Sequence, residues 1–222
     1  MRSLYHLPLD PGSRKIRILL KEKGLDCELK SEKTWERRED FLRLNPAGEV
    51  PVLIEAEGTV ITGAMVIAEY LEEVYPEPPL IGSEPLDRAE VRRLCAWFDG
   101  KFGQEVSSLL IEEKVMKRFL GLGHPEATAI RAALQNIHYH LEYIVWLSDR
   151  RNWLAGERFS LADAAAAAHI STVDYLGDVP WEDHPEAKEW YARVKSRPSM
   201  RQILADYVPG FPPPKHYGDP DF

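Results

Sequence analysis

The sequence has few cysteines. Only Cys27 and Cys95 occur in 222 residues, far apart and in no Cys-x-x-Cys motif. This excludes a disulfide framework and argues against a redox dithiol or a cysteine-rich zinc site. We expect both to be buried, reduced thiols in a reducing compartment.

Long apolar runs are also lacking. No stretch approaches the eighteen residues of a membrane span, and the alanine run 164–168 has only five residues. The first residues, "MRSLYHLPLD", lack the apolar core of a signal peptide. We therefore expect a cytoplasmic protein without membrane insertion.

Positive charge is in deficit. With 28 Lys and Arg against 36 Asp and Glu, the net charge is −8, which disfavours nucleic acid as a partner. The seven histidines show no HExxH spacing, and His138 and His140 point nearly opposite ways on a helix. We predict no metal.

What is present begins with an alternation of strand and helix patterns. "SLYHL" and "CELKSEK" predict strands on either side of an amphipathic helix over 14–23, which Gly24 would end. "VPVLIEAEGTVIT" predicts a hairpin around Glu57-Gly58, and a helix follows over about 64–74. The first eighty residues thus predict a βαβββα unit.

The composition then changes to helical periodicity. We predict helices over 87–118, 125–150, 160–176, 185–196 and 199–206. In "FSLADAAAAAHI", Ser160 and Asp163 have the spacing of a capping box at a helix start. The resulting division is an α/β domain over 1–78, an all-helical domain over 79–206, and a tail over 207–222 that its five prolines exclude from a helix.

Four motifs in this order resemble the cytosolic glutathione transferase superfamily. They are "LYHLPLDPGSRKIRILLKEKGL", "LNPAGEVPVLIEAEGTVITGAMVIAEYLEE", "GERFSLADAAAA" and "WYARVKSRPS". The resemblance covers about 1–206. It implies a thioredoxin-like N-terminal domain followed by a helical domain, and a homodimer.

The resemblance also implies positions for a glutathione site. In this family the bond that matches Val50-Pro51 is cis, and the backbone before the proline pairs with the cysteinyl part of glutathione. Ser13 matches the catalytic position at the first strand–helix junction, where its hydroxyl, with Arg14 and Lys15 nearby, would lower the pKa of the bound thiol. The alternative for Ser13 is an ordinary helix N-cap.

One departure from the family pattern weakens this site. An acidic residue followed by Ser or Thr usually holds the γ-glutamyl end of glutathione, and here Gly63 and Ala64 stand in those places. Hydrogen bonds to charged groups contribute about 1.5–3 kcal/mol each, so losing two weakens binding on the order of a hundredfold or more. We expect the glutathione site to be degenerate and no cofactor to be required.

Two features favour a protein partner instead. Trp35, in the charged loop "EKTWERREDF", is either an interface anchor or packs beneath its loop. The tail, with Asp219, Asp221 and Phe222 at its end, either docks into a partner or straps the helical domain.

The Gly-Ala pair and the Asp-Phe ending resemble glutathione-transferase-like division proteins of alphaproteobacteria. This closer resemblance implies binding to filaments of the tubulin-like GTPase FtsZ, through the tail, at the division site. The alternative function is an active transferase that conjugates glutathione to small electrophiles.

Overall fold

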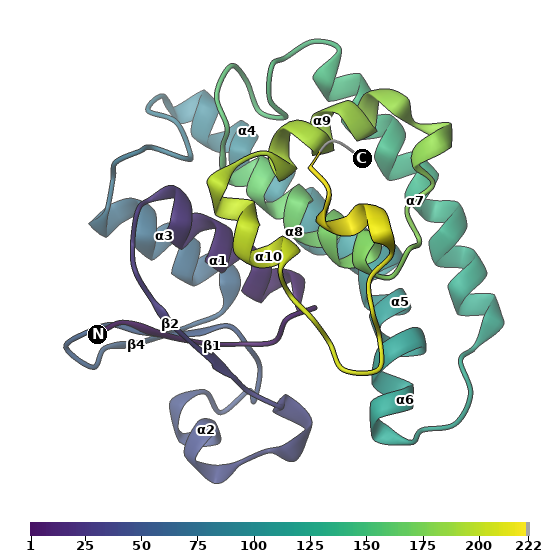
Figure 1. Ribbon diagram of the computed structural model, residues 1–222. Coiled ribbons are helices and arrows are strands. Elements are labelled where there is room, and N and C mark those ends of the chain that lie inside the picture. Colours follow the sequence, from purple (N-terminus) through teal and green to yellow (C-terminus); the bar gives the residue numbers. More distant parts are fainter. Residues whose placement is uncertain (221–222) are drawn as a thin grey trace.

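The N-terminal part is built around a mixed four-stranded sheet (Figure 1). A computed structural model describes residues 1–220 of the chain. The strand order is β2-β1-β3-β4, with β1 parallel to β2 and antiparallel to β3, and with β3 and β4 forming the predicted hairpin. The strands are β1 (Ser3–His6), β2 (Glu28–Ser31), β3 (Val52–Ile54) and β4 (Val60–Thr62).

Helices α1 (Pro11–Glu22) and α3 (Ala64–Val74) flank this sheet, as the sequence predicts. Ile16 and Leu19 of α1 are fully buried, and Gly24 follows the helix with a φ of +65°, which favours glycine. The predicted loop between β2 and β3 also contains two short helices, η1 (Thr34–Glu36) and α2 (Glu39–Leu44). They are too short to give a helical period in the sequence.

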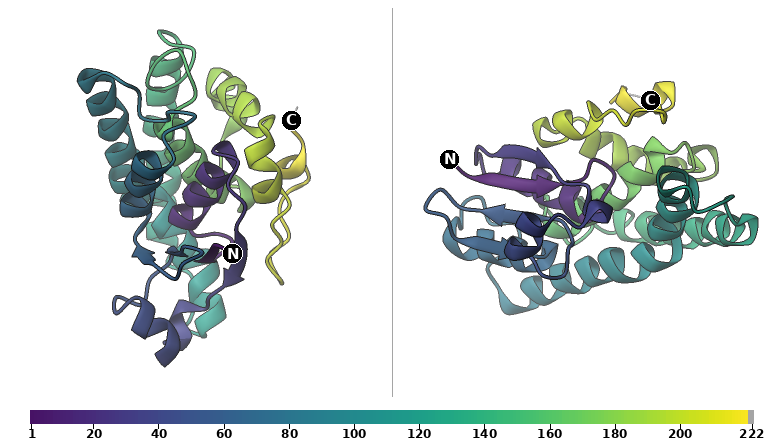
Figure 2. Two further views of the ribbon diagram at one scale, coloured as in Figure 1. Left: turned by 90° about the vertical axis from the view of Figure 1, so that its left-hand side faces the viewer. Right: turned by 90° about the horizontal axis from the view of Figure 1, so that it is seen from below.

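The second part is all helical. Helix α8 is its centre: all fifteen of its residues are buried, and its run of alanines lets neighbouring helices pack closely, α1 among them (Figure 2). Residues 85–120 form one continuous helical segment with wide π-type turns. The elements are α4 (Pro85–Ala96), η2 (Trp97–Ser107), α5 (Ser108–Ile111), η3 (Glu112–Met116), α6 (Lys117–Leu120), α7 (Ala127–Ser148), α8 (Leu161–Tyr175), η4 (Trp181–Asp183), α9 (Pro185–Lys195), η5 (Pro198–Met200) and α10 (Arg201–Leu204).

The predicted capping box at the start of α8 is confirmed. The Ser160 hydroxyl accepts from the Ala162 N–H at 3.2 Å, and the Asp163 carboxylate accepts from the Ser160 N–H at 3.0 Å. Asp163 also accepts from the backbone of Leu154 and the Trp190 indole. One buried carboxylate therefore joins the start of α8 to two other segments.

The tail straps the helical domain. Tyr217 is fully buried, and with Leu9, Val115, Tyr175 and Val208 it forms a small hydrophobic cluster apart from the main core. The prediction that the tail contains no helix was too strict, because 215–218 form a 3₁₀ turn, η6 (Lys215–Gly218). The domain limits at 78/79 and 206/207 stay a prediction. The sheet unit ends with α3 at Val74, and the helices begin with α4 at Pro85.

The two cysteines are free, but only Cys95 is buried; Cys27 is half-exposed, contrary to expectation. Burial raises the pKa of Cys27 to about 11 and that of Cys95 to about 12, so neither is a ready nucleophile. Within residues 1–220, no helix has the length and hydrophobicity to cross a membrane.

Candidate functional site

Three backbone segments converge where the family resemblance places glutathione. The Val50-Pro51 bond is cis, and the Pro51 carbonyl accepts from the Gly63 N–H at 3.2 Å. A Cβ atom at Gly12 would lie 3.2 Å from Cβ of Ala64 and 3.3 Å from Cδ of Pro51. The start of α1, the entry to β3 and the start of α3 are therefore in close contact.

The start of α3 offers backbone amides but no side chain. Gly63 is the N-cap residue, with a φ of +88°, and it makes no side-chain capping hydrogen bond. Ala64 follows as the first helical residue. A γ-glutamyl carboxylate at this helix end would find the partial positive charge of the helix and nothing more from these two residues.

Ser13 is fully buried in the third position of α1, and the residue that caps the helix is Asp10. The Asp10 carboxylate accepts from the Ser13 N–H at 2.6 Å, and the Ser13 hydroxyl accepts from the Leu7 N–H at 3.3 Å. The simple N-cap interpretation of Ser13 is therefore wrong. Catalysis by Ser13 stays a prediction, although its hydroxyl lies inside the protein.

Asp10 occupies the place that would stabilise an anion at the start of α1. Burial raises the pKa of this carboxyl, and hydrogen bonds from Ser13 oppose that rise. A thiolate brought to the same helix end would compete with a carboxylate for the amides there. The Asp10 carboxylate already accepts from one of these amides, the N–H of Ser13.

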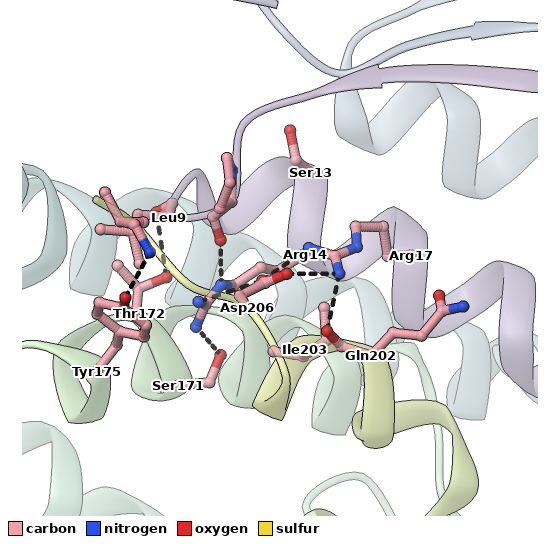
Figure 3. Close-up of polar contacts among 12 residues, drawn as sticks. Leu9, Ser13, Arg14, Arg17, Ser171, Thr172, Tyr175, Gln202, Ile203 and Asp206 are labelled. Atoms are coloured by element: carbon pink, nitrogen blue, oxygen red, sulfur yellow. Dashed lines mark hydrogen bonds and ion pairs between the residues drawn. The ribbon is translucent and has the colours of Figure 1, made fainter. Parts of the chain in front are cut away.

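The cations of α1 do not face Ser13. Arg14 is fully buried and donates from Nε to the Pro8 carbonyl at 2.6 Å and from Nη1 to the Ser171 hydroxyl at 2.9 Å. Lys15 is paired with Asp99 of η2. Figure 3 shows Ser13 pointing to the other side of α1 from Arg14 and Arg17. The expectation that Arg14 and Lys15 lower a thiol pKa at Ser13 has no support in this geometry.

A cleft of about 660 Å³ opens beside these elements. Its walls come from the turn before α1, the η1 loop, the segment α5–α6 and the beginning of the tail. The side chains that line it include Trp35, Ile111, Met116, Phe119 and Tyr207. The cleft is mainly apolar, and Asp10 is one of the residues that line it.

Trp35 is half-buried and makes a specific contact instead of lying loose in its loop. Its ring stacks on Phe119 with centroids 6.2 Å apart, and Phe119 in turn packs on Phe211 of the tail at 5.3 Å. We call Trp35, Phe119 and Phe211 the aromatic row. The row joins the N-terminal domain, the helical domain and the tail on one surface, and Phe119 is 44% exposed.

The predicted tail residues lie elsewhere. Asp219 is exposed and follows η6, which is held on the α8–α9 side by a His216–Asp174 contact of 2.9 Å. Asp221 and Phe222 lie outside the described residues. Trp35 is therefore linked to the tail through Phe119, which packs on Phe211.

Sequence reasoning missed Phe119 and Phe211. Phe119 lies near the end of a helix, two residues before Gly121, and nothing in the helical period signals its contact with Trp35, 84 positions earlier. An aromatic residue in a proline-rich tail was the signal that could have drawn attention to Phe211. Among residues 1–220, no group of three or more metal-ligating side chains is arranged to hold an ion.

Comparison with known proteins agrees with this architecture. Residues 11–74 match the family description "Glutathione S-transferase, N-terminal domain", and residues 115–198 match "Glutathione S-transferase, C-terminal domain". The chain belongs to the glutathione S-transferase family, and its fold is the thioredoxin-like sheet domain and helical domain of that family.

Within this family, the likeness to several members extends over the whole chain. The sequence is 49% identical to FtsZ-localized protein A of Caulobacter vibrioides, covering 100% of this chain and 98% of that protein. The structure of FzlA from C. crescentus superimposes with a TM-score of 0.97 at 49% identity, covering 100% of this chain and 99% of that one. A glutathione S-transferase from Rhodospirillum rubrum superimposes with a TM-score of 0.99 at 57% identity over the full length of both chains.

Proposed function

We propose that this protein binds FtsZ filaments in the cytoplasm at the bacterial division site and that its glutathione site is degenerate. The observation that carries the proposal is the 49% identity to FtsZ-localized protein A, which spans the tail as well as both domains. A glutathione S-transferase fold alone would support only the family. The function must therefore be argued from the surface and from the state of the glutathione site.

The geometry of the glutathione position supports the degenerate site. Gly63 and Ala64 offer no side-chain hydrogen bond at the start of α3, and Asp10 fills the start of α1. Both features reduce the affinity for glutathione. The missing side chains at Gly63 and Ala64 act at its γ-glutamyl end, and Asp10 acts at its thiolate. The retained cis bond at Val50-Pro51 leaves a backbone contact for the cysteinyl part.

The aromatic row and the end of the tail are the proposed partner surface. Trp35 has the character of an interface anchor, because it is a large, half-buried ring that is held by the stacked Phe119. Its loop is fixed at the base, where Arg38 pairs with the buried Glu32. Asp219, Asp221 and Phe222 are the proposed partner contacts at the end of the tail.

Co-sedimentation with FtsZ polymers tests this surface. Because Tyr217 is buried, the informative truncation removes only 219–222 and leaves that anchor in place. We expect this truncation and Trp35→Ala each to weaken pelleting by about tenfold or more, as loss of an interface anchor does. Leu86→Ala, at an exposed leucine on α4 that belongs to neither proposed surface, is the control. Wild-type pelleting by both test variants would contradict the proposal.

The second candidate function is glutathione transfer to small electrophiles, which the family match and the cis Val50-Pro51 bond favour. In that case Ser13 activates the thiol and the apolar cleft takes the electrophile. Ser13→Ala would then abolish turnover of a chlorodinitrobenzene while the fold is kept. Unchanged turnover would exclude this role for Ser13.

We also propose a homodimer, as is common in this family. Tyr139 and Trp146 on α7 are about half exposed, and they adjoin Trp97 and Tyr143, with Trp97 and Tyr143 centroids 4.6 Å apart. An aromatic surface of this size fits an interface between subunits better than open solvent. Light scattering coupled to size exclusion gives the mass directly, against 25.4 kDa for one chain.

A further inference from the structure

The tail leaves the helical domain at a buried ion pair with α1 (Figure 3). Arg17 donates from Nη1 and Nη2 to the two carboxylate oxygens of Asp206, at 2.8 and 2.9 Å. The same guanidinium donates to the Gln202 carbonyl at 3.0 Å. This two-point geometry fixes the orientation of the chain just after α10, where the tail begins.

Arg14 contacts the residue just before the tail and a ring within it. Its Nη2 lies 3.5 Å from Asp206, and its guanidinium carbon lies 5.9 Å from the centre of the Tyr217 ring. The Tyr175 ring lies on it as well, at 5.8 Å. Arg14 has no exposed surface, so these contacts are made in a low-dielectric interior where cation–π attraction is strongest.

This cluster holds more positive than negative charge. Two buried guanidinium groups share a single carboxylate, since Asp206 is the one acidic side chain that pairs with either of them within residues 1–220. His6 lies nearby, and burial together with Arg17 lowers its pKa to about 4, so it adds no charge at neutral pH. Removal of the Asp206 charge would leave two cations buried without compensation, which proteins tolerate poorly.

Beyond Asp206, hydrogen bonds to the helical domain hold the tail in place. Two residues later, the Val208 N–H donates to the Tyr175 hydroxyl at 2.8 Å, and that hydroxyl donates to the Phe211 carbonyl at 2.8 Å. These bonds hold Phe211 against Phe119 in the aromatic row. At the other end, the Tyr217 hydroxyl donates to the Ile203 carbonyl at 3.0 Å, which places η6 directly before Asp219.

We propose that Arg14, Arg17 and Asp206 form a tail clamp. They are positioning residues that fix the tail against α1 and α8 and thereby build both parts of the partner surface. The inference rests on the proposed function, because it gives the basic residues of α1 a role in partner binding. It explains why Arg14 and Arg17 turn away from Ser13 and towards the helical domain.

The test combines two measurements on the full chain with Asp206→Asn, which keeps the shape and removes the charge. We expect FtsZ co-sedimentation to weaken by about tenfold. We also expect trypsin to cleave after the exposed Lys215 at least tenfold faster, with loss of 216–222 seen by mass spectrometry. Asp26→Asn, at the exposed Asp26–Lys21 pair, is the matched control and should change neither.

Each outcome supports or contradicts the proposed clamp. Faster trypsin cleavage of Asp206→Asn together with weaker FtsZ co-sedimentation supports it. Unchanged cleavage overturns it whatever the binding does, and faster cleavage with wild-type binding also overturns it, because the tail would then need no fixed position. If Asp206→Asn does not fold, Arg17→Lys keeps the charge, loses the two-point geometry and is measured in the same way. Wild-type pelleting by the 219–222 truncation would refute the proposed tail contact, while the cleavage rate would still report on the clamp separately.

Discussion

Asp10 is the residue that caps α1, and its carboxylate accepts from the Ser13 N–H at the start of that helix. We propose that this one carboxylate also excludes a glutathione thiolate from the same helix end. Ser13, the residue that resembles the catalytic position, contributes its N–H to that carboxylate. The hydroxyl itself is used inside the protein by Leu7.

A titration with reduced glutathione tests this arrangement. We expect no saturable binding tighter than about 0.1 mM, or about −5.5 kcal/mol, when the ligand is raised to about 10 mM. Asp10→Asn keeps the cap and removes the negative charge, so we expect it to bind glutathione about tenfold more tightly than the wild type. Calorimetry on both proteins gives the comparison.

S-methylglutathione, which has no thiol to ionise, is the matched control ligand. It should gain nothing from Asp10→Asn. Tight binding of glutathione by the wild type would show that the losses at Gly63 and Ala64 are compensated, and the transferase function would then become the leading one. Equal affinities of wild type and variant for glutathione would show that Asp10 does not exclude the thiolate.

The side-chain roles on α1 show where sequence reasoning stops. A pattern can place Ser13, Arg14 and Lys15 near a helix start, but it does not say which way each side chain faces. Arg14 meets Ser171 and Asp206, which are 157 and 192 positions away along the chain, and those contacts turn it from the site. Long-range pairs of this kind leave no mark in a single sequence.

At the scale of elements, local signals predicted most of the fold. The hairpin at Glu57-Gly58 and the helix over 64–74 were found because turn chemistry and periodicity act over neighbouring residues. Helix α2 was missed, because six residues are fewer than two turns. The tail was expected to lack helix on account of its prolines, yet Pro214 precedes a 3₁₀ turn that starts at Lys215.

The start of α8 is the element whose loss we expect to be most damaging. Asp163 is fully buried and accepts from the N–H groups of Leu154 and Ser160, and from the Trp190 indole at 3.1 Å. Asp163→Ala removes the acceptor for all of them, so we expect a loss of about 3 kcal/mol or more in the free energy of unfolding. Urea unfolding followed by circular dichroism measures this value.

Asp149→Ala provides the control for that experiment. Asp149 lies exposed at the end of α7, and its loss should change the free energy of unfolding by no more than about 0.5 kcal/mol. Should Asp163→Ala prove as stable as this control, the capping box would not be the anchor of α8. Asp163→Asn, which retains one acceptor oxygen, should fall between the two.

At the scale of the whole molecule, α1 belongs to both domains. It lies beside the sheet, yet it packs on α8, and its charged residues pair with the helical domain along its length. Lys15 meets Asp99, Arg17 meets Asp206, and Glu22 accepts from both Nε and Nη2 of Arg197 at 2.7 Å. The same helix is thus held by contacts with both domains.

We therefore expect a single calorimetric unfolding transition in which the sheet domain and the helical domain melt together.

Glu22→Gln should reduce the free energy of unfolding by about 1–3 kcal/mol and thereby lower the midpoint temperature. The reason is that it leaves the partly buried Arg197 without its carboxylate. Glu39→Gln, at an exposed pair with Arg43, should leave the midpoint unchanged. Two separated transitions in the wild type would contradict this expectation and show that α1 does not couple the domains. Splitting only in Glu22→Gln would mean that the Glu22–Arg197 pair carries most of the coupling, and that the clamp at Asp206 holds the tail without holding the domains together.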